Sequence, residues 1–551
     1  MNNAEPSQNK PNAEKSGAVS QKNLITLIIV IALAVCLCAV AIIAVIQTIR
    51  NDNPTTAPTV NEEAQAEEVR NTIAMTLGEH QINAVELNYY YTETLNQFLQ
   101  EYYYYIYYYG MIDTAKPLNE QYFDKEKEIT WADYILDLAK DNIKSTYMLC
   151  DMAAANGFAL PDAEQASLEA VRKNIEEYAV NNKYEDADSY VADIFGLGAD
   201  LESYMAYFER ALLADAYYSD YAESLKYTDD QLRAYESGKE HEYNCYSFAS
   251  YYLDPAKFLT GGTEGSDGKV TYTDEQIAAS IEAARAAAEA LLGNTCDSLE
   301  AFQDLILSMD VNASLESVKV NEQNDVFYSE IDKAFQEWII SADRNFGDVT
   351  VIPKTTVSGE GESAVETTEG FYILWFGGVN DNTVMLKDVR HILVLFKNDA
   401  GKTYSDGITS FTDAQKATAL AAAEALLEQW KSGEATEDSF AALAAEKTED
   451  GGSKNTGGLY EDIYPGQMVP NFNDWCFDES RQFGDTGIVE SPYGYHIMFF
   501  VSDAELNYRD YMITYAMRTE DLNEWHTEML ENAELTEVCL DFCPLDQTLA
   551  G

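Results

Sequence analysis

The sequence contains an internal repeat, and this repeat constrains the fold more than any local pattern does. Residues 335–338 read Phe-Gln-Glu-Trp and residues 472–475 read Phe-Asn-Asp-Trp; at equal spacing, each is followed by Phe-Gly-Asp, at 346–348 and 483–485. Composition alone does not produce two such motifs in the same order. The sequence therefore predicts that one fold occurs twice along the chain.

Further matches on both sides of these motifs set the limits of the two copies. Thr273 and Thr412 each open a Thr-Asp-x-Gln sequence, which is the capping-box pattern of a helix N-terminus, and an Ala-rich stretch follows each. Downstream, Gly370 and Gly494 each begin an aromatic, strand-like run. We place the first copy at residues 239–381 and the second at 386–503.

The two copies differ in residues that can carry chemistry. His391 lies in the run Val-Arg-His-Ile-Leu-Val and His496 in Tyr-Gly-Tyr-His-Ile-Met, and these are two of the five histidines in the chain. In the first copy the strand-like residues 243–246 hold no histidine, and Tyr372 stands where the second copy has His496. We expect the second copy to carry a functional site and the first to be degenerate and inactive.

A characteristic series of motifs lies between the two histidines. It consists of Thr-Glu-Asp at 448–450, Gly-Gly-Leu at 457–459, Pro-Gly-Gln-Met at 465–468, and then Phe472. This order and spacing resembles the parvulin family of peptidyl-prolyl cis/trans isomerases. The resemblance implies an α+β fold in which helices flank a small antiparallel sheet, with no cofactor and no metal.

The resemblance also implies a role for each matching residue. The catalytic positions are His391, Asp450, Ser491 and His496, and the substrate-binding positions, which form a cup for the proline ring, are Leu459, Met468 and Phe472. Rotation about an Xaa-Pro bond meets a barrier of about 20 kcal/mol because amide resonance is broken. A catalyst needs no covalent step and has only to bind the twisted amide better than the planar one.

Each of these residues also has a purely structural explanation. A histidine in an apolar strand can serve mainly to stabilise the core, and Met468 and Phe472 can be ordinary core residues. Asp450 and Ser491 lie in turn-forming sequences. Tyr460 departs from the family pattern, because glycine is usual there, and we expect this change to reshape the rim of the cup.

Other chemistries find no support in the sequence. There is no HExxH, P-loop, GxSxG or zinc-type spacing of Cys and His. The loop after His391 lacks the basic cluster of phosphate-directed parvulins, so we do not expect specificity for phosphorylated Ser/Thr-Pro. The net charge of −60 excludes an electrostatic grip on nucleic acid.

The N-terminal region is predicted to anchor the chain in a membrane. Leu24 through Ile46 is an apolar run without a charged residue, long enough to cross a bilayer. Lysines precede it and an acidic segment follows, so the positive-inside rule predicts a cytoplasmic tail at 1–23, a transmembrane helix at 24–47 and an external linker at 48–76. A cleaved signal peptide and a lipid-modified Cys36 are the alternatives.

The remaining regions are predicted to be helical. Apolar residues recur at helical spacing through 77–238, and the C-terminal segment 504–551 is helical again. Tyrosines crowd positions 89–91 and 102–109, where they can pack between helices or line a groove. The layout is similar to that of PrsA-like and SurA-like foldases, in which such flanking segments build a chaperone domain.

Together these patterns predict a single-pass protein of the cell membrane whose bulk lies outside the cytoplasm. Its predicted function is peptidyl-prolyl isomerase and chaperone for secreted proteins, with unfolded polypeptides containing Xaa-Pro bonds as partners. The alternative is a non-catalytic holdase or cell-surface scaffold with inactive parvulin modules. The eight cysteines form no CxxC motif and define no disulfide framework, and the oligomeric state stays open.

Overall fold

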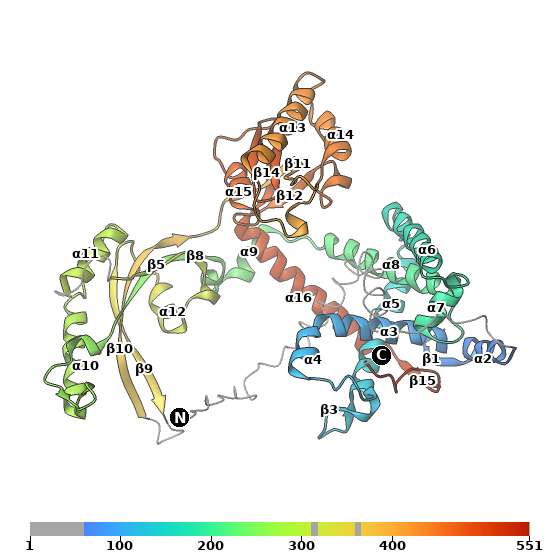
Figure 1. Cartoon of the computed structure of the whole chain (residues 1–551), viewed down its shortest axis with the longest axis horizontal. Helices are drawn as coiled ribbons and strands as arrows, with labels where there is room; N and C mark the ends of the chain where they lie inside the picture. The colour runs from blue at the N-terminus through green and yellow to red at the C-terminus, as the bar shows by residue number, and fades with distance from the viewer. Residues whose placement is uncertain (1–59, 310–317, 359–364, 550–551) are drawn as a thin grey trace. The chain divides into compact units, whose positions relative to one another are not determined.

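The computed structural model describes residues 60–309, 318–358 and 365–549 (Figure 1). The predicted transmembrane segment 24–47 lies outside these residues. Within the described part of the chain, no helix is both long and apolar enough to span a bilayer. The described residues form two compact units. The first runs to Lys226 and includes the residues from Met517 onward, and the second is Tyr227–Ala516.

The first unit is mainly helical. Its helices are α2 (Val60–Asn71), α3 (Ala84–Glu101), α4 (Tyr103–Tyr109), α5 (Trp131–Ala155), α6 (Asp162–Asn181), α7 (Ala187–Phe195) and α8 (Leu201–Ser224). Side chains at the N-termini define where helices begin: Asn83 accepts from the backbone N–H of Glu86, and Thr130 and Asp200 complete capping boxes. The helices enclose one large apolar core.

Short strands complete this unit. β1 (Ile73–Leu77) pairs with β2 (His80–Asn83) on one side and with β15 (Leu535–Glu537) on the other, all antiparallel. A second small pair is β3 (Tyr122–Asp124) with β4 (Ile129–Thr130). The C-terminal segment therefore supplies an edge strand to a sheet that begins near the first described residues.

The tyrosine-rich stretches separate into a buried and an exposed group. Tyr89, Tyr90 and Tyr91 lie in the core, where Tyr89 contacts Phe195 and Tyr204 edge-on. In α4, by contrast, Ile106 is buried, while the six tyrosines are 41–72% exposed. Packing between helices thus explains the first group, and the second group forms an exposed aromatic surface.

The second unit contains two sheets built alike. The first copy has strands β5 (Cys245–Leu253), β8 (Asn321–Phe327), β9 (Val349–Ser358) and β10 (Val365–Asn380), and the second has β11 (Met385–Leu395), β12 (Leu459–Ile463), β13 (Thr486–Glu490) and β14 (Gly494–Asn507). The sheet orders are β8-β5-β10-β9 and β12-β11-β14-β13, all antiparallel. The repeat seen in the sequence is thus a repeat of topology.

Helices occupy matching places in the two copies. They are α10 (Asp274–Glu289), α11 (Leu299–Met309) and α12 (Lys333–Ile339) in the first, and α13 (Asp413–Lys431), α14 (Glu437–Lys447) and α15 (Pro470–Cys476) in the second. The predicted capping boxes of Thr273 and Thr412 are confirmed. A small hairpin of β6 (Thr263–Glu264) and β7 (Val270–Thr271) also belongs to the first copy, α9 (Asp229–Glu236) precedes it, and α16 (Tyr508–Asn532) follows the second.

The sheet of the second copy has two different faces. Because side chains alternate along a strand, Ile392, Ile497 and Phe499 point to the face covered by α13 and α14, where they pack with Phe440. Val389, Met498 and Phe500 point to the opposite face, where they pack with Phe472 of α15. The α+β class predicted from the sequence is confirmed for the described residues.

Candidate active site

His391 and His496 lie side by side on the two central strands of the second sheet. His391 follows Val389 by two positions on β11 and His496 precedes Met498 by two on β14, so both rings share the face covered by α15. Their Nδ1 atoms are 3.1 Å apart and the rings lie nearly parallel at 5.2 Å. The sheet thus builds a histidine pair from residues more than a hundred positions apart.

Each histidine binds a further polar side chain through its other ring nitrogen. His391 Nε2 lies 3.0 Å from Asp450 Oδ2 and 3.0 Å from Ser453 Oγ. His496 Nε2 lies 2.8 Å from Ser491 Oγ. The four residues predicted as catalytic are therefore joined in one hydrogen-bonded chain, Ser491–His496–His391–Asp450.

Two members of this network were not predicted. Ser453 Oγ donates to Asp450 Oδ2 at 2.5 Å, and the Tyr460 hydroxyl donates to the same oxygen at 3.0 Å. Tyr460 was expected only to alter the rim of the cup, because glycine is usual in the family at that position. In this chain Tyr460 instead binds the Asp450 carboxylate. Its ring is tilted relative to the His391 ring, and the two ring centroids are 5.2 Å apart.

Burial and hydrogen bonding set the protonation of the site. Burial, followed by the proximity of His391, lowers the pKa of His496 from 6.5 to about 3, so this ring is neutral at physiological pH. The hydrogen bond from His391, together with those from Ser453 and Tyr460, holds the pKa of Asp450 well below its ordinary value. Burial, then the Asp450 charge, raises the pKa of Tyr460 to about 12. Asp450 is thus ionised and Tyr460 keeps its proton.

One placement of protons satisfies the three pairs that form the chain. The Ser491 hydroxyl donates to His496 Nε2, His496 Nδ1–H donates to His391 Nδ1, and His391 Nε2–H donates to the Asp450 carboxylate. Every hydrogen bond in the chain then points toward Asp450. Because hydrogen bonds aligned in this way polarise one another, the arrangement favours a negative charge on that carboxylate.

Two residues of the predicted proline cup lie against the histidine pair. The Phe472 ring stands edge-on to His496 at 5.3 Å and to His391 at 5.5 Å, and it is 2% exposed. Met468 is half-buried and packs against the same cluster of residues as Phe472. Leu459, also half-buried, begins β12 and pairs in register with Arg390. Because residues paired across strands share a face, Leu459 lies on the side of the sheet opposite the histidines, and of the three predicted substrate-binding residues only Met468 and Phe472 border the pair.

The histidines themselves are covered by protein. His391 is 2% exposed and His496 is 6% exposed, whereas Asp450, Tyr460 and Met468 are each partly open to solvent. A substrate at this surface reaches the carboxylate, the tyrosine and the methionine before it reaches either ring. The imidazoles are thus shielded from solvent, and His391 holds Asp450 at the surface.

Gly458 fits its place because no larger residue can occupy it. Its carbonyl accepts from the backbone N–H of His391 at 2.8 Å, and its φ of +77° lies in the left-handed region. A Cβ at this position would come within 2.3 Å of the His391 carbonyl oxygen. A side chain cannot be accommodated here without moving the strand that holds His391.

The first copy presents a different set of side chains at the equivalent place. In register, Met498 pairs with His391 and Leu374 pairs with Ser250, so Ser250 is the counterpart of His391. The predicted strand residues 243–246 lie too early, because β5 begins at Cys245 and the relevant position is further along. Tyr372 replaces His496 as predicted, and Phe335 stands edge-on to it at 5.0 Å, as Phe472 does to His496.

Residues 391–501 match the family model of the PPIC-type PPIase domain, a rotamase. No curated protein matches the chain. Among solved structures, PrsA of Bacillus anthracis is 20% identical over 27% of this chain and 59% of its own, with a TM-score of 0.17. PrsA of Bacillus cereus is 26% identical over 30% and 57%, also with a TM-score of 0.17.

A SurA-like chaperone structure from Campylobacter jejuni, reported for PEB4 and Cj1289, is 21% identical over 28% of this chain and 57% of its own, with a TM-score of 0.14. The matches thus span less than two thirds of these proteins. The family model confirms the resemblance noted in the sequence for the part of the chain that holds the histidine pair. Residues 391–501 are a parvulin-type, PPIC-type peptidyl-prolyl isomerase domain.

Proposed function

We propose that the chain is a foldase that isomerises Xaa-Pro bonds at the Asp450 site and holds unfolded polypeptide with its helical unit. The observation that carries this proposal is the hydrogen-bonded chain Ser491–His496–His391–Asp450 beside Phe472. It ties one ionised carboxylate to the histidine pair that the apolar ring of Phe472 borders. No covalent step and no cofactor are required.

The geometry suggests how rotation is eased. In a planar amide the carbonyl oxygen carries partial negative charge and the nitrogen partial positive charge, and both are lost as the bond twists. A carboxylate facing the carbonyl therefore destabilises the planar form relative to the twisted one. Phe472 and Met468 hold the proline ring while the preceding residue turns, so the binding energy of the ring is used for orientation.

A peptide assay tests the catalytic half of the proposal. We expect the full-length chain to accelerate isomerisation of a short Xaa-Pro peptide, and Met468→Ala to reduce kcat/KM about tenfold or more because the ring loses one wall. Met309→Ala, which truncates a half-buried methionine of α11 in the first copy, is the matched control and should keep wild-type activity. A wild-type rate equal to the uncatalysed rate would refute the enzyme and favour the non-catalytic holdase.

The first copy is proposed to be inactive. Ser250 and Tyr372 stand where the histidine pair would be, so the described residues of the first copy hold no counterpart of the two imidazoles. The activity that remains in a Met468→Ala, Asp450→Asn double variant should therefore equal background. Residual catalysis in that variant would assign activity to the first copy.

The exposed tyrosines of α4 support the chaperone half of the proposal. Tyr108 and Tyr109 are 72% and 70% exposed, and neighbouring rings contact each other along the helix, as Tyr104 and Tyr108 do at 4.9 Å. Exposed aromatic surface of this kind marks interaction sites. Replacement of Tyr104, Tyr108 and Tyr109 by serine should weaken the suppression of aggregation of an unfolded client and leave the isomerase rate on short peptides unchanged.

The membrane location is part of the same proposal. It is supported by the apolar, uncharged sequence from Leu24 to Ile46 and by the lysines that precede it. We expect the full-length chain to sediment with membranes and to be digested by protease added outside intact cells. Deletion of residues 1–47 should release the chain from the membrane fraction. Protection from external protease would overturn the predicted orientation.

A further inference from the structure

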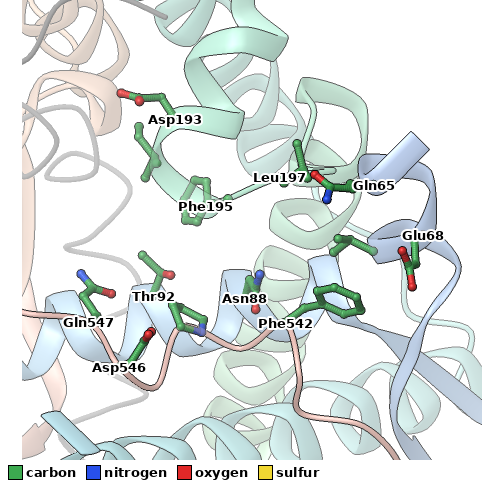
Figure 2. Close-up of a pocket in the computed structure, with 14 residues that line it drawn as sticks. Gln65, Glu68, Asn88, Thr92, Asp193, Phe195, Leu197, Phe542, Asp546 and Gln547 are labelled. Carbon is green, nitrogen blue, oxygen red and sulfur yellow. The ribbon is translucent and has the colours of Figure 1, made fainter. Parts of the chain in front are cut away.

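The first unit contains a cavity that the proposed isomerase activity does not use. Its volume is about 540 Å³, within the range of about 300–1,000 Å³ typical of ligand sites. Figure 2 shows it between α2, α3, the end of α7 and the C-terminal segment that follows β15. Segments from both ends of the described chain therefore form its walls.

Every charged side chain that lines the cavity is acidic. Glu68 extends from α2, Asp193 from α7 and Asp546 from the C-terminal segment, and the lining includes no lysine, arginine or histidine (Figure 2). Asp193 also accepts a hydrogen bond from the Tyr184 hydroxyl at 2.7 Å. Three carboxylates around one opening create a negative potential that attracts a cation and repels an anion.

An unsatisfied polar group lies at the floor of the same cavity. Asn88 of α3 is 5% exposed, and its Oδ1 has no hydrogen-bond partner among the described residues. Its Nδ2 faces Gly196, another lining residue, because a Cβ added to that glycine would lie 3.6 Å away. A buried amide oxygen without a partner is costly, and a hydrogen-bond donor on a ligand in the cavity would remove that cost.

The remaining walls suit an aliphatic or peptide group. Phe195, 5% exposed, and the half-buried Phe542 provide apolar surface between the carboxylates. Gln65 and Gln547 add side-chain amides, which can pair with the N–H and C=O groups of a peptide backbone. The lining thus offers apolar contact for a methylene chain, carboxylates for its charged end and amides for the backbone that bears it.

We propose that this cavity binds an arginine or lysine side chain of an unfolded polypeptide, so that the helical unit prefers basic client segments. The inference rests on the proposed chaperone function and specifies its substrate class. It also fits the charge of the whole protein, since a chain of net charge −60 associates most readily with basic partners. An arginine side chain is favoured because its fork of N–H donors can bind a carboxylate through two parallel hydrogen bonds.

Calorimetry with two peptides tests this inference on the full-length chain. The probes are acetyl-Ser-Leu-Arg-Leu-Ser-amide and the same peptide with citrulline, which is nearly isosteric with arginine but uncharged. We expect the arginine peptide to bind at least tenfold more tightly, and its affinity to fall severalfold between 50 and 300 mM salt, in keeping with charge attraction. Equal affinities for the two peptides would overturn the proposal.

Matched variants locate the binding. Glu68→Gln, Asp193→Asn and Asp546→Asn combined should abolish the preference for arginine over citrulline. The control variant makes the same change in net charge at exposed helical positions of the same unit, by combining Glu169→Gln, Glu176→Gln and Glu223→Gln. This control should keep the preference for arginine over citrulline. If the cavity variant keeps the preference, the peptide binds elsewhere on the acidic surface and the assignment fails.

A substitution at Asn88 provides a second, independent readout. Asn88→Leu replaces the amide, whose oxygen is unpaired, by an apolar group of similar size. We therefore expect it to raise the thermal unfolding midpoint and to lower the affinity for the arginine peptide severalfold. A stabilised protein with unchanged peptide affinity would show that Asn88 takes no part in the site and would overturn its role.

A separate aggregation assay tests the proposed chaperone function itself. Aggregation of an unfolded lysine- and arginine-rich protein is followed with wild type and with the two triple variants. If wild type does not suppress aggregation, the proposed chaperone function is refuted. If wild type and the cavity variant suppress it equally well, the function stands and the inference about basic clients fails. We expect wild type and the control variant to suppress it and the cavity variant to be impaired.

Discussion

At the scale of single residues, the site depends on how Asp450 and His496 are kept in one protonation state each. Asp450 accepts from His391, Ser453 and Tyr460, and His496 is buried next to a second ring. The family pattern in the sequence identified the four members of the chain, but not the donors around Asp450. The role of Ser453 and Tyr460 depends on how the loop closes on β12, and loop closure has no local sequence signal.

The stability of the protein should reflect the neutral state of His496. In the unfolded chain this ring takes up a proton near its ordinary pKa of 6.5, but in the folded protein it does so only at about 3. Protons therefore favour the unfolded state between these values, and stability falls as pH falls through that window, by at most roughly 1.4 kcal/mol per pH unit for one group.

Replacement of His496 by glutamine isolates this effect. We expect the difference in unfolding free energy between wild type and His496→Gln to be largest above pH 6.5 and to shrink steadily toward pH 3, as measured by urea unfolding at a series of pH values. A difference that is independent of pH across this range would mean that the folded ring titrates normally.

Asp450 should affect stability in the same direction as His496, but at lower pH, and its hydrogen-bond donors should affect the rate. Its folded pKa is lowered from 3.8, so its stabilising contribution is complete above that value and is lost as pH falls below it.

Tyr460 donates one of the hydrogen bonds to the Asp450 carboxylate. We expect Tyr460→Phe, which removes this donor, to reduce kcat/KM several-fold and to lower the free energy of unfolding by about 1–3 kcal/mol. Peptide isomerisation and urea unfolding of the same preparation measure both quantities. Unchanged kcat/KM would remove Tyr460 from the site.

At the scale of elements, the turn before β12 and the strand β11 fix the position of His391. The backbone of Gly458 bonds to that of His391 and leaves no room for a side chain. The sequence showed a Gly-Gly-Leu turn, and the family resemblance located it correctly. What the sequence did not reveal is the close approach of turn and strand, because distance between segments is a property of the folded chain.

A pair of glycine variants tests this constraint. Gly458 and Gly466 both have positive φ, +77° and +85°, but a Cβ at Gly466 meets no atom within 4 Å. Gly466→Ala should cost about 1–2 kcal/mol through backbone strain alone. Gly458→Ala should cost several kcal/mol more and abolish isomerase activity, because the added methyl group displaces His391. Equal effects of the two variants in thermal unfolding and in the peptide assay would refute the steric argument.

The first copy shows the same limit of sequence reasoning at the level of register. The repeat predicted a second sheet of the same kind, and its strand order is indeed the same. The counterpart of His391 was sought at 243–246 but is Ser250, because β5 is displaced along the chain from the expected run. A shift in pairing register moves side chains along the sheet or to its other face. The pattern of apolar and polar residues does not determine the register where most strand residues are apolar.

At the scale of the whole molecule, the chain returns at its end to the unit in which it begins. β15 pairs with β1, and the backbone N–H groups of Val538 and Cys539 bind the Ala74 carbonyl. The buried His526 of α16 also contacts Ser145 of α5 at 2.9 Å. The sequence suggested a C-terminal segment that folds back, but a short strand such as 535–537 has no clear pattern of its own.

Removal of residues 535–551 tests the importance of this return. The deletion leaves one edge of β1 unpaired and uncovers apolar residues of the helical core, so we expect a clear fall in the unfolding midpoint of the first unit. The rate on short Xaa-Pro peptides should stay within about twofold of wild type, because the second unit does not include this segment. Loss of activity at temperatures where the protein remains folded would show that the activity of the second unit depends on an intact first unit.

The coverage of both imidazoles has a consequence for how the enzyme meets its substrates. Its reactive groups are already assembled before any proline arrives, since the protein itself supplies every neighbour of the two rings. Little binding energy is then needed to organise the site, and a four-residue substrate can be turned over as quickly as a long one. Any advantage of long clients must consequently arise through capture by other surfaces of the chain, and it will be visible as a lower KM at constant kcat.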